Sequence, residues 1–137
     1  MRVTTRAAND SDLPFLREVD RHVPREVLAE VVSSGRVLVA ELDGAAVGCL
    51  RWGLFWDAVP FMNLLFVVPE CRGERVGTTL VETWEEAQRA AGHSFVLTST
   101  VAAETAQHLY RRLGYVDTGA LLLPGEATEL ILRKDLS

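Results

Sequence analysis

The chain is poor in cysteine and has no long uninterrupted apolar stretch. Its 137 residues include only two cysteines, Cys49 and Cys71, which is too few for a disulfide scaffold and favours the reducing cytoplasm. No CxxC or HxxxH spacing occurs, and His22, His93 and His108 are scattered, so we expect no metal site. Charged residues or prolines interrupt every apolar stretch before it reaches the length of a membrane span. We therefore expect a cytoplasmic protein that does not associate with membranes.

Positive charge is scarce as well. The chain has 14 Lys and Arg residues against 19 Asp and Glu residues, a net charge of −5, which argues against nucleic acid as a partner. The acidic excess permits the attraction of a cationic substrate. With 48% hydrophobic and 24% charged residues, the composition is that of a folded globular protein, and the length fits a single domain over residues 1–137.

Hydrophobic spacing and turn residues predict the element order β-α-α-β-β-β-α-β-α-β-β. The strands are expected near residues 3–7, 37–42, 46–56, 61–68, 95–98, 115–123 and 128–133, and the helices after residues 9–12 and over residues 24–33, 76–91 and 106–113. This order fits an α/β or α+β fold, with a mixed central sheet and helices on both of its faces.

Two of these elements carry more detailed expectations. The continuous apolar character of residues 61–68 indicates a central strand that is buried on both faces. In the helix over residues 76–91, one side is apolar. The other side carries Glu82, Glu85, Glu86 and Arg89, which we expect to face solvent.

A glycine-containing turn, Arg72-Gly73-Glu74-Arg75-Val76-Gly77-Thr78, lies between the strand over residues 61–68 and the following helix. Unpaired backbone N–H groups and the positive end of the helix dipole meet at such a turn, which suits a phosphate group. The alternative is a tight strand-to-helix connection without a ligand. The turn has no GK[ST], so it is not a P-loop, and no GxGxxG follows the first strand as a dinucleotide-binding fold requires.

A second stretch, over residues 106–115, contains Ala106, Tyr110, Gly114 and Tyr115. Together the two stretches resemble the GNAT superfamily of acyl-coenzyme A-dependent N-acyltransferases. The cofactor motif of that family, [QR]-x-x-G-x-[GA] after an L-x-V strand end, is similar to residues 72–77 after Leu65-Phe66-Val67. Its later pattern, A-x-x-x-Y-x-x-x-G-[FY], is matched by the residues of the second stretch. The element order also agrees with the family fold, in which two strands of the sheet splay apart.

The resemblance implies a binding site for acetyl-coenzyme A (acetyl-CoA) as the acyl donor. Main-chain groups at the strand end would line the pantetheine arm, and N–H groups of the turn would hold the pyrophosphate. The implied cofactor-binding residues are Leu65, Phe66, Val67, Arg72, Gly73, Glu74, Arg75, Val76, Gly77 and Thr78. Two positions depart from the family pattern. Arg75 replaces a frequent glycine, which the cradle tolerates if its dihedral angles stay in the ordinary region, and Ala103 replaces a frequent asparagine that touches the pantetheine arm.

The resemblance also implies that Tyr110 is the catalytic acid that reprotonates the departing thiolate. A phenol with a pKa of about 10 is protonated at neutral pH and suits that role. The alternative is a core tyrosine at helical spacing with Leu109 and Leu113. No general base is evident. Asn63 lies in an apolar strand, where it either positions substrate or a water molecule or is a buried amide satisfied by the backbone.

The acceptor is expected against the aromatic-rich stretch over residues 51–63. The candidate substrate-binding residues are Trp56, Asp57, Phe61 and Asn63. Trp52 and Trp56, four apart in the expected strand, should share a face and suit an apolar or cationic amine. An aromatic core is the alternative.

We interpret the chain as an N-acetyltransferase that moves an acetyl group from acetyl-CoA to an amine of a small molecule by direct attack on the thioester. A protein N-terminal or lysine acetyltransferase, and an acyl-CoA-binding module without transferase activity, are the alternatives. The resemblance leaves a homodimer open.

Overall fold

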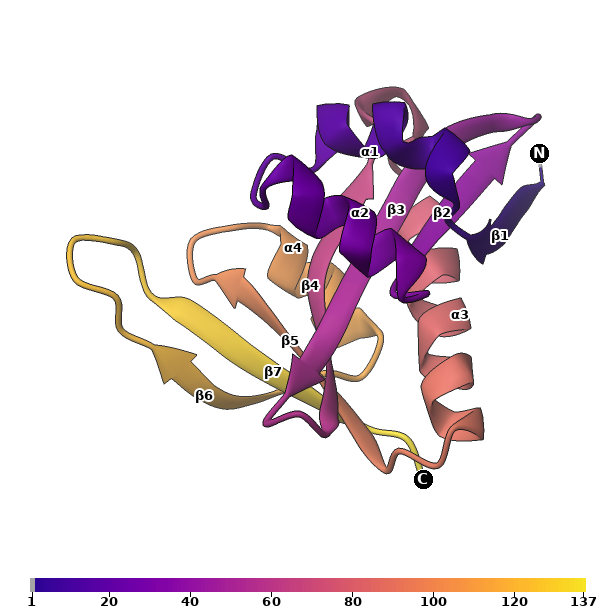
Figure 1. Cartoon of the computed structure of the whole chain (residues 1–137). Helices are drawn as coiled ribbons and strands as arrows, with labels where there is room; N and C mark the ends of the chain where they lie inside the picture. The colour runs from indigo at the N-terminus through magenta and orange to yellow at the C-terminus, as the bar shows by residue number, and fades with distance from the viewer. Residues whose placement is uncertain (1) are drawn as a thin grey trace. The chain divides into compact units, whose positions relative to one another are not determined.

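The computed structural model describes residues 2–137 (Figure 1). The strands are β1 (Val3–Ala7), β2 (Val37–Leu42), β3 (Ala45–Phe55), β4 (Val59–Val67), β5 (Phe95–Val101), β6 (Val116–Leu121) and β7 (Glu129–Asp135). The helices are α1 (Leu13–Val19), α2 (Arg25–Ser33), α3 (Val76–Ala90) and α4 (Ala106–Arg112), with 3-10 turns η1 (Asp10–Asp12) and η2 (Pro69–Cys71). None of the helices in residues 2–137 combines the length and the apolar character that crossing a bilayer requires.

The strands form a mixed sheet in the order β1-β2-β3-β4-β5-β7-β6. The β4–β5 pair is parallel, whereas β1–β2, β2–β3, β5–β7 and β6–β7 are antiparallel. This confirms the predicted α/β class and element order. The chain forms two compact units, one of residues up to Gly53 with Leu64–Trp84 and one of Leu54–Asn63 with Glu85–Ser137.

In the first unit, helices cover both faces of the sheet. The β2–β3 register pairs Val39 with Cys49 and Ala40 with Gly48, and neighbouring residues of a strand point to opposite faces. Val39 and Cys49 belong to a buried cluster with side chains of α1 and α2, namely Leu16, Leu28, Val31 and Val32. Gly48 faces α3, because a Cβ placed on it would lie 3.0 Å from Val76 Cγ1.

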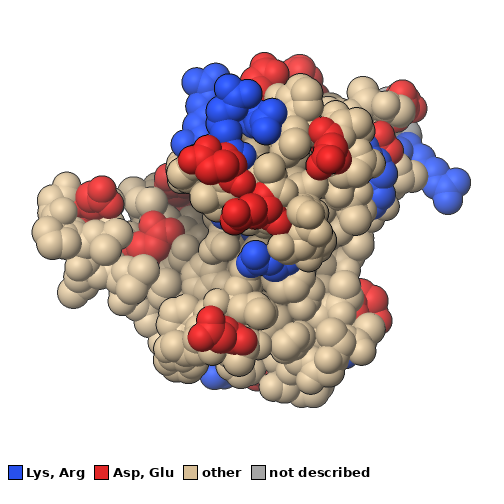
Figure 2. Space-filling model, in the orientation of Figure 1, with Lys and Arg blue, Asp and Glu red and all other residues tan. Residues whose placement is uncertain are grey.

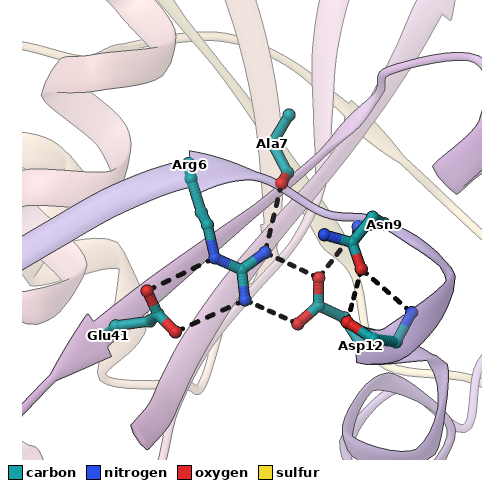
Figure 3. A network of polar contacts seen from close by, with 6 residues as sticks. Arg6, Ala7, Asn9, Asp12 and Glu41 are labelled. Carbon is teal, nitrogen blue, oxygen red and sulfur yellow. Dashed lines mark hydrogen bonds and ion pairs between the residues drawn. The ribbon is translucent and has the colours of Figure 1, made fainter. Parts of the chain in front are cut away.

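An ion-pair network joins β1 to η1 and β2 in the first unit (Figure 3). Arg6 donates from both terminal nitrogens to the carboxylate of Asp12, at 2.7 and 2.8 Å. Arg6 also lies 3.3 Å from Glu41 through its Nε. The Asp12 side chain is nearly buried and accepts the backbone N–H of Asn9, which caps η1. The hydrogen bonds from Arg6 lower the pKa of Asp12 below its ordinary value.

This network makes the stability of the first unit depend on pH. A carboxyl group whose pKa is lowered by folding stabilises the folded state above its unfolded pKa of about 3.9, and the contribution is lost as the pH falls through the folded pKa. We expect Asp12→Asn to lower the free energy of unfolding by about 1–2 kcal/mol at pH 7. The difference should narrow below about pH 4. Urea unfolding at pH 7 and pH 3 measures it, with the exposed Asp10→Asn as the control. An equal difference at both pH values would contradict the assignment.

In the second unit, β5 pairs with β7 along its whole length, and β6 lies at the edge of the sheet with all six residues exposed. Within the second unit, the parallel β4–β5 ladder pairs Phe61 with Leu97 and Met62 with Thr98. Asn63, the next residue of β4, is not part of this ladder. Helix α4 packs against β5.

Two expectations about these elements are wrong. Helix α3 does not turn Glu85 toward solvent: Glu85 and Gln88 are buried, whereas Ala87 and Ala91 are exposed. The carboxylate of Glu85 is held by hydrogen bonds inside the second unit, which apolar periodicity does not reveal. Strand β4 is not buried on both faces either, because Asn63 is exposed and Leu64–Val67 are only half-buried.

Candidate functional site

One candidate site is the segment over residues 65–78 of the first unit, which we call the cofactor segment. Strand β4 ends at Val67, η2 follows, and α3 begins at Val76. The first hydrogen bond of the helix runs from the Thr79 N–H to the Arg75 carbonyl, at 2.9 Å. The N–H groups of residues 76–78 therefore have no acceptor within the helix, and they carry the positive end of its dipole. The arrangement can bind an anionic group such as a diphosphate.

The charges around the start of α3 also favour the binding of an anionic group. Arg72 and Arg75 are exposed beside it, and the first turn of α3 contains no acidic residue. Arg72 donates from its Nε to the Val67 carbonyl at 3.1 Å, which ties the turn to the end of β4. Arg75 lies 3.9 Å from Glu82, but both side chains are largely exposed, so this ion pair contributes little. Glu74 is exposed in the same turn.

The backbone of Arg75 departs from our expectation. Its φ is +64°, in the left-handed region, and Gly73 in the same turn has a φ of +87°. The condition that the cradle keep ordinary dihedral angles at residue 75 is therefore not met. A left-handed arginine costs roughly 1–2 kcal/mol relative to ordinary backbone, and only glycine adopts this conformation freely. This left-handed conformation explains why a glycine would be favoured at residue 75.

Replacement of Arg75 tests this strain. We expect Arg75→Gly to be at least as stable as the wild type and about 1 kcal/mol more stable than Arg75→Ala, because alanine keeps the left-handed penalty. The two variants lose the same charge and the same ion pair with Glu82, so each is the control of the other. Urea unfolding gives the comparison. If Arg75→Ala proved as stable as Arg75→Gly, the left-handed conformation would not be a source of strain.

The end of β4 lies close to β3 in the cofactor segment. The Val68 N–H donates to the Val47 carbonyl at 2.9 Å. A Cβ on Gly48 would lie 2.9 Å from the Phe66 carbonyl oxygen, so only glycine fits beside this part of β4. Leu65, Phe66 and Val67 are half-buried. Their main chain thus belongs to a partly open strand end that leads directly into the turn over residues 72–78.

Another candidate site surrounds Tyr110 in the second unit. Tyr110 lies in α4 with an exposed fraction of 5%. Burial raises the pKa of its hydroxyl, a contact with the Thr98 hydroxyl offsets part of that effect, and the charge of Glu104 adds to it. Thr98 in turn donates to the Met62 carbonyl at 3.0 Å, where the β4–β5 ladder ends. Tyr110 therefore stays protonated at neutral pH, as an acid must.

Three of the four candidate substrate residues lie together. Trp56 and Asp57 form the tight turn between β3 and β4, with φ values of +55° and +58°, and the Ala58 N–H donates to the Phe55 carbonyl at 3.1 Å. The Phe55 ring lies 4.6 Å from the ring of Trp56 and 6.1 Å from that of Phe61, centroid to centroid. The Trp56 side chain is 79% exposed. Asn63 is exposed on β4 and is thus no buried amide.

The expectation that Trp52 and Trp56 share a strand face is wrong. Trp56 lies beyond the end of β3 in a left-handed turn, so the alternation of the strand does not extend to it. Trp52 is half-buried, and its ring lies 6.3 Å from that of Trp84 in the first unit. Turns with two left-handed residues usually contain asparagine, aspartate or glycine. A tryptophan in the first central position gives no such signal.

Sequence reasoning missed several polar side chains of the two units. Thr98, next to Tyr110, was detectable as a hydroxyl in an apolar strand. The buried ion pair between Asp20 and Arg51, at 2.6 Å, was detectable only through a lone arginine in the apolar run of β3.

Cys49 and Cys71 are free, and burial raises the pKa of the Cys49 thiol to about 12. Among residues 2–137, no three potential metal ligands lie close together.

Comparisons with known proteins identify a family and a fold that the chain resembles. The family model described as "Acetyltransferase (GNAT) domain" matches residues 33–117. The chain is 37% identical over 86 residues to an IAA acetyltransferase of Azospirillum brasilense, covering 61% of this chain and 56% of that one. It is 35% identical over 103 residues to an uncharacterized N-acetyltransferase of Methanocaldococcus jannaschii, covering 70% and 64%. The chain thus spans less than two thirds of either relative. The crystal structure of Ard1 from Thermoplasma volcanium has the same fold, with a TM-score of 0.89 at 14% identity over 100% of this chain and 99% of that one.

Proposed function

The chain belongs to the GNAT acetyltransferase family, and we propose that it transfers an acetyl group from acetyl-CoA to the amine of a small molecule. The observation that carries the proposal is the start of α3, where unpaired N–H groups and two exposed arginines follow directly on a partly open strand end. We propose the whole of residues 1–137 as one transferase domain that acts in the cytoplasm, where Cys49 and Cys71 would remain free thiols.

The proposed roles of the residues are cofactor binding and proton transfer. Acetyl-CoA supplies the activated acetyl group as a thioester. The N–H groups at the start of α3, with Arg72 and Arg75, would hold the pyrophosphate, and the main chain of Leu65, Phe66 and Val67 would hold the pantetheine arm. The Tyr110 hydroxyl would donate its proton to the departing sulfur and regain one from solvent. No described side chain is assigned as a general base, so the neutral fraction of the amine would attack.

The aromatic turn at β3–β4 supports an amine acceptor. The exposed Trp56 ring and the neighbouring Asp57 carboxylate suit a protonated amine, which ring faces and carboxylates both attract. In the view of Figure 2, basic side chains gather over the N-terminal helices with acidic ones beside them, and much of the remaining surface is uncharged. The face drawn in Figure 2 thus carries charges of both signs.

Release of the CoA thiol tests the proposal. Purified protein is mixed with acetyl-CoA and a panel of amines: alkylamines, polyamines, aromatic amines, amino acids, and short peptides with free N-termini or lysines. A thiol reagent reports the CoA released. Cys71 is half-exposed and contributes a background that reactions without amine measure, whereas Cys49 is buried. Thermal unfolding with acetyl-CoA, with ATP and NAD as controls, measures donor binding separately.

Each outcome separates the alternatives. Thiol release with small amines supports the proposal, and release with peptides alone shows that the acceptor is a protein. A raised melting temperature with acetyl-CoA but no turnover on any amine identifies a binding module. If acetyl-CoA fails to raise the melting temperature, the donor site itself is wrong. Sedimentation of the same samples determines whether the protein is a homodimer, which the family resemblance leaves open.

A further inference from the structure

A buried carboxylate lies outside the residues that the proposed reaction uses. Glu85 of α3 has an exposed fraction of 3%. One of its oxygens accepts a hydrogen bond from the Tyr115 hydroxyl at 2.9 Å, and the other accepts one from Lys134 Nζ at 2.8 Å. Burial of a carboxylate is unfavourable unless it is paired and hydrogen-bonded. All three residues lie in the second unit, and together we call them the Glu85 network.

The Glu85 network is in direct contact with Tyr110. The Tyr115 ring is buried, and its centroid lies 5.8 Å from that of Tyr110 at an interplanar angle of 58°. The Tyr115 N–H also donates to the Tyr110 carbonyl at 3.0 Å. Lys134 Nζ lies 5.9 Å from the centre of the Tyr115 ring. Burial and the charge of Glu85 raise the pKa of Tyr115, so its hydroxyl remains a donor to the carboxylate.

Helix α4 needs external support to hold Tyr110 in one place. It has only seven residues and ends at Arg112, and the left-handed Gly114 that follows its C-cap has a φ of +99°. A helix this short has little stability of its own and depends on tertiary contacts. The groups that face Tyr110 from other elements are the Thr98 hydroxyl and the Tyr115 ring, with Glu104 before α4. Of these, only the Tyr115 ring is itself held by a buried charged group.

We propose that Glu85 and Tyr115 are positioning residues that fix the Tyr110 ring where its hydroxyl meets the departing sulfur. The inference rests on the proposed function and adds to it the residues that position the proposed acid. The packing against Tyr110 needs only the ring of Tyr115, which a phenylalanine would also supply. The hydroxyl of Tyr115 adds the hydrogen bond to Glu85, which stops the ring from shifting against Tyr110.

A double-mutant cycle tests the proposal through kcat, with acetyl-CoA and the most active amine of the panel. Tyr115→Phe keeps the ring and removes the hydrogen bond, and we expect it to lower kcat roughly tenfold with little change in KM for acetyl-CoA, because small displacements of a catalytic group are costly. In a Tyr110→Phe background, Tyr115→Phe should cause no further loss, since residues that act as a unit are not additive. Glu85→Gln should behave as Tyr115→Phe does, and Glu86→Gln, on the exposed side of α3, is the matched control.

A spectroscopic measurement on the free protein completes the test. The chain has only two tyrosines, so 13C labelling at the tyrosine ζ carbon gives two signals, assigned by the two phenylalanine variants. We expect the Tyr110 signal to shift in Glu85→Gln and to stay in place in Glu86→Gln. An additive loss of kcat in the cycle, or an unmoved Tyr110 signal, overturns the positioning role. If Tyr110→Phe alone leaves kcat unchanged, Tyr110 is not the acid, and the failure then lies in the proposed function.

Discussion

Replacement of Tyr110 by phenylalanine is expected to lower kcat by about a hundredfold, the range typical of a positioned general acid. The substitution removes one hydroxyl and keeps the ring that α4 buries, so the fold should persist. The KM for acetyl-CoA should change little, because the N–H groups and arginines that we propose to bind the pyrophosphate lie in the cofactor segment. Steady-state kinetics with the best amine of the panel measures both constants.

The loss should also depend on the leaving group. A thiol of lower pKa needs less help from an acid when it departs, so an acyl donor with a more acidic thiol should recover part of the rate in Tyr110→Phe but gain less in the wild type. Tyr115→Phe on the same donors is a useful comparison, since it leaves the hydroxyl of Tyr110 in place. If Tyr110→Phe retained the full kcat, the tyrosine would be a core residue, which was the alternative interpretation of its spacing.

The sequence predicted the elements and the strand–turn–helix order of the cofactor segment because both depend on local signals. Helix α3 begins directly after the glycine-containing turn, as expected from the strand–turn–helix pattern. Tyr110 is recognisable because Ala106, Gly114 and Tyr115 recur at fixed spacings around it. Hydrophobic periodicity and turn chemistry act over a few residues, so they are readable without the fold.

The misplaced residues depend on contacts between distant parts of the chain. Glu85 has the spacing of a solvent-facing glutamate, and only the Tyr115 hydroxyl and Lys134, 30 and 49 residues away, explain its burial. Trp56 and Arg75 have backbone conformations that their side chains disfavour. Sequence reasoning assigns ordinary backbone to such residues, and it is wrong where the surroundings enforce another conformation, as happens at functional sites.

A second large effect is expected from the buried ion pair of the first unit. Arg51 on β3 donates from its Nε to Asp20 at 2.6 Å, and Asp20 follows the last turn of α1. The two residues have exposed fractions of 8% and 3%. Asp20 also accepts the backbone N–H of His22, at 3.4 Å, so it holds the segment between α1 and α2 against the sheet.

Removal of one partner leaves the other charge buried and unpaired, which costs about 3–5 kcal/mol. We expect Asp20→Asn to lower the melting temperature by roughly 10–17 °C, given an unfolding entropy of about 2.1 cal/mol/K per residue over 137 residues. The double variant Asp20→Asn/Arg51→Met carries neither charge of this buried pair and should recover at least half of that loss, because removal of both partners is often nearly neutral.

Glu18→Gln is the control, since it removes a negative charge from the exposed side of α1 and should leave the melting temperature unchanged. If the double variant were no more stable than Asp20→Asn, the loss would come from packing around the α1–α2 segment and the unpaired arginine would not be its cause. The comparison therefore separates the charge of Arg51 from the shape of the side chains.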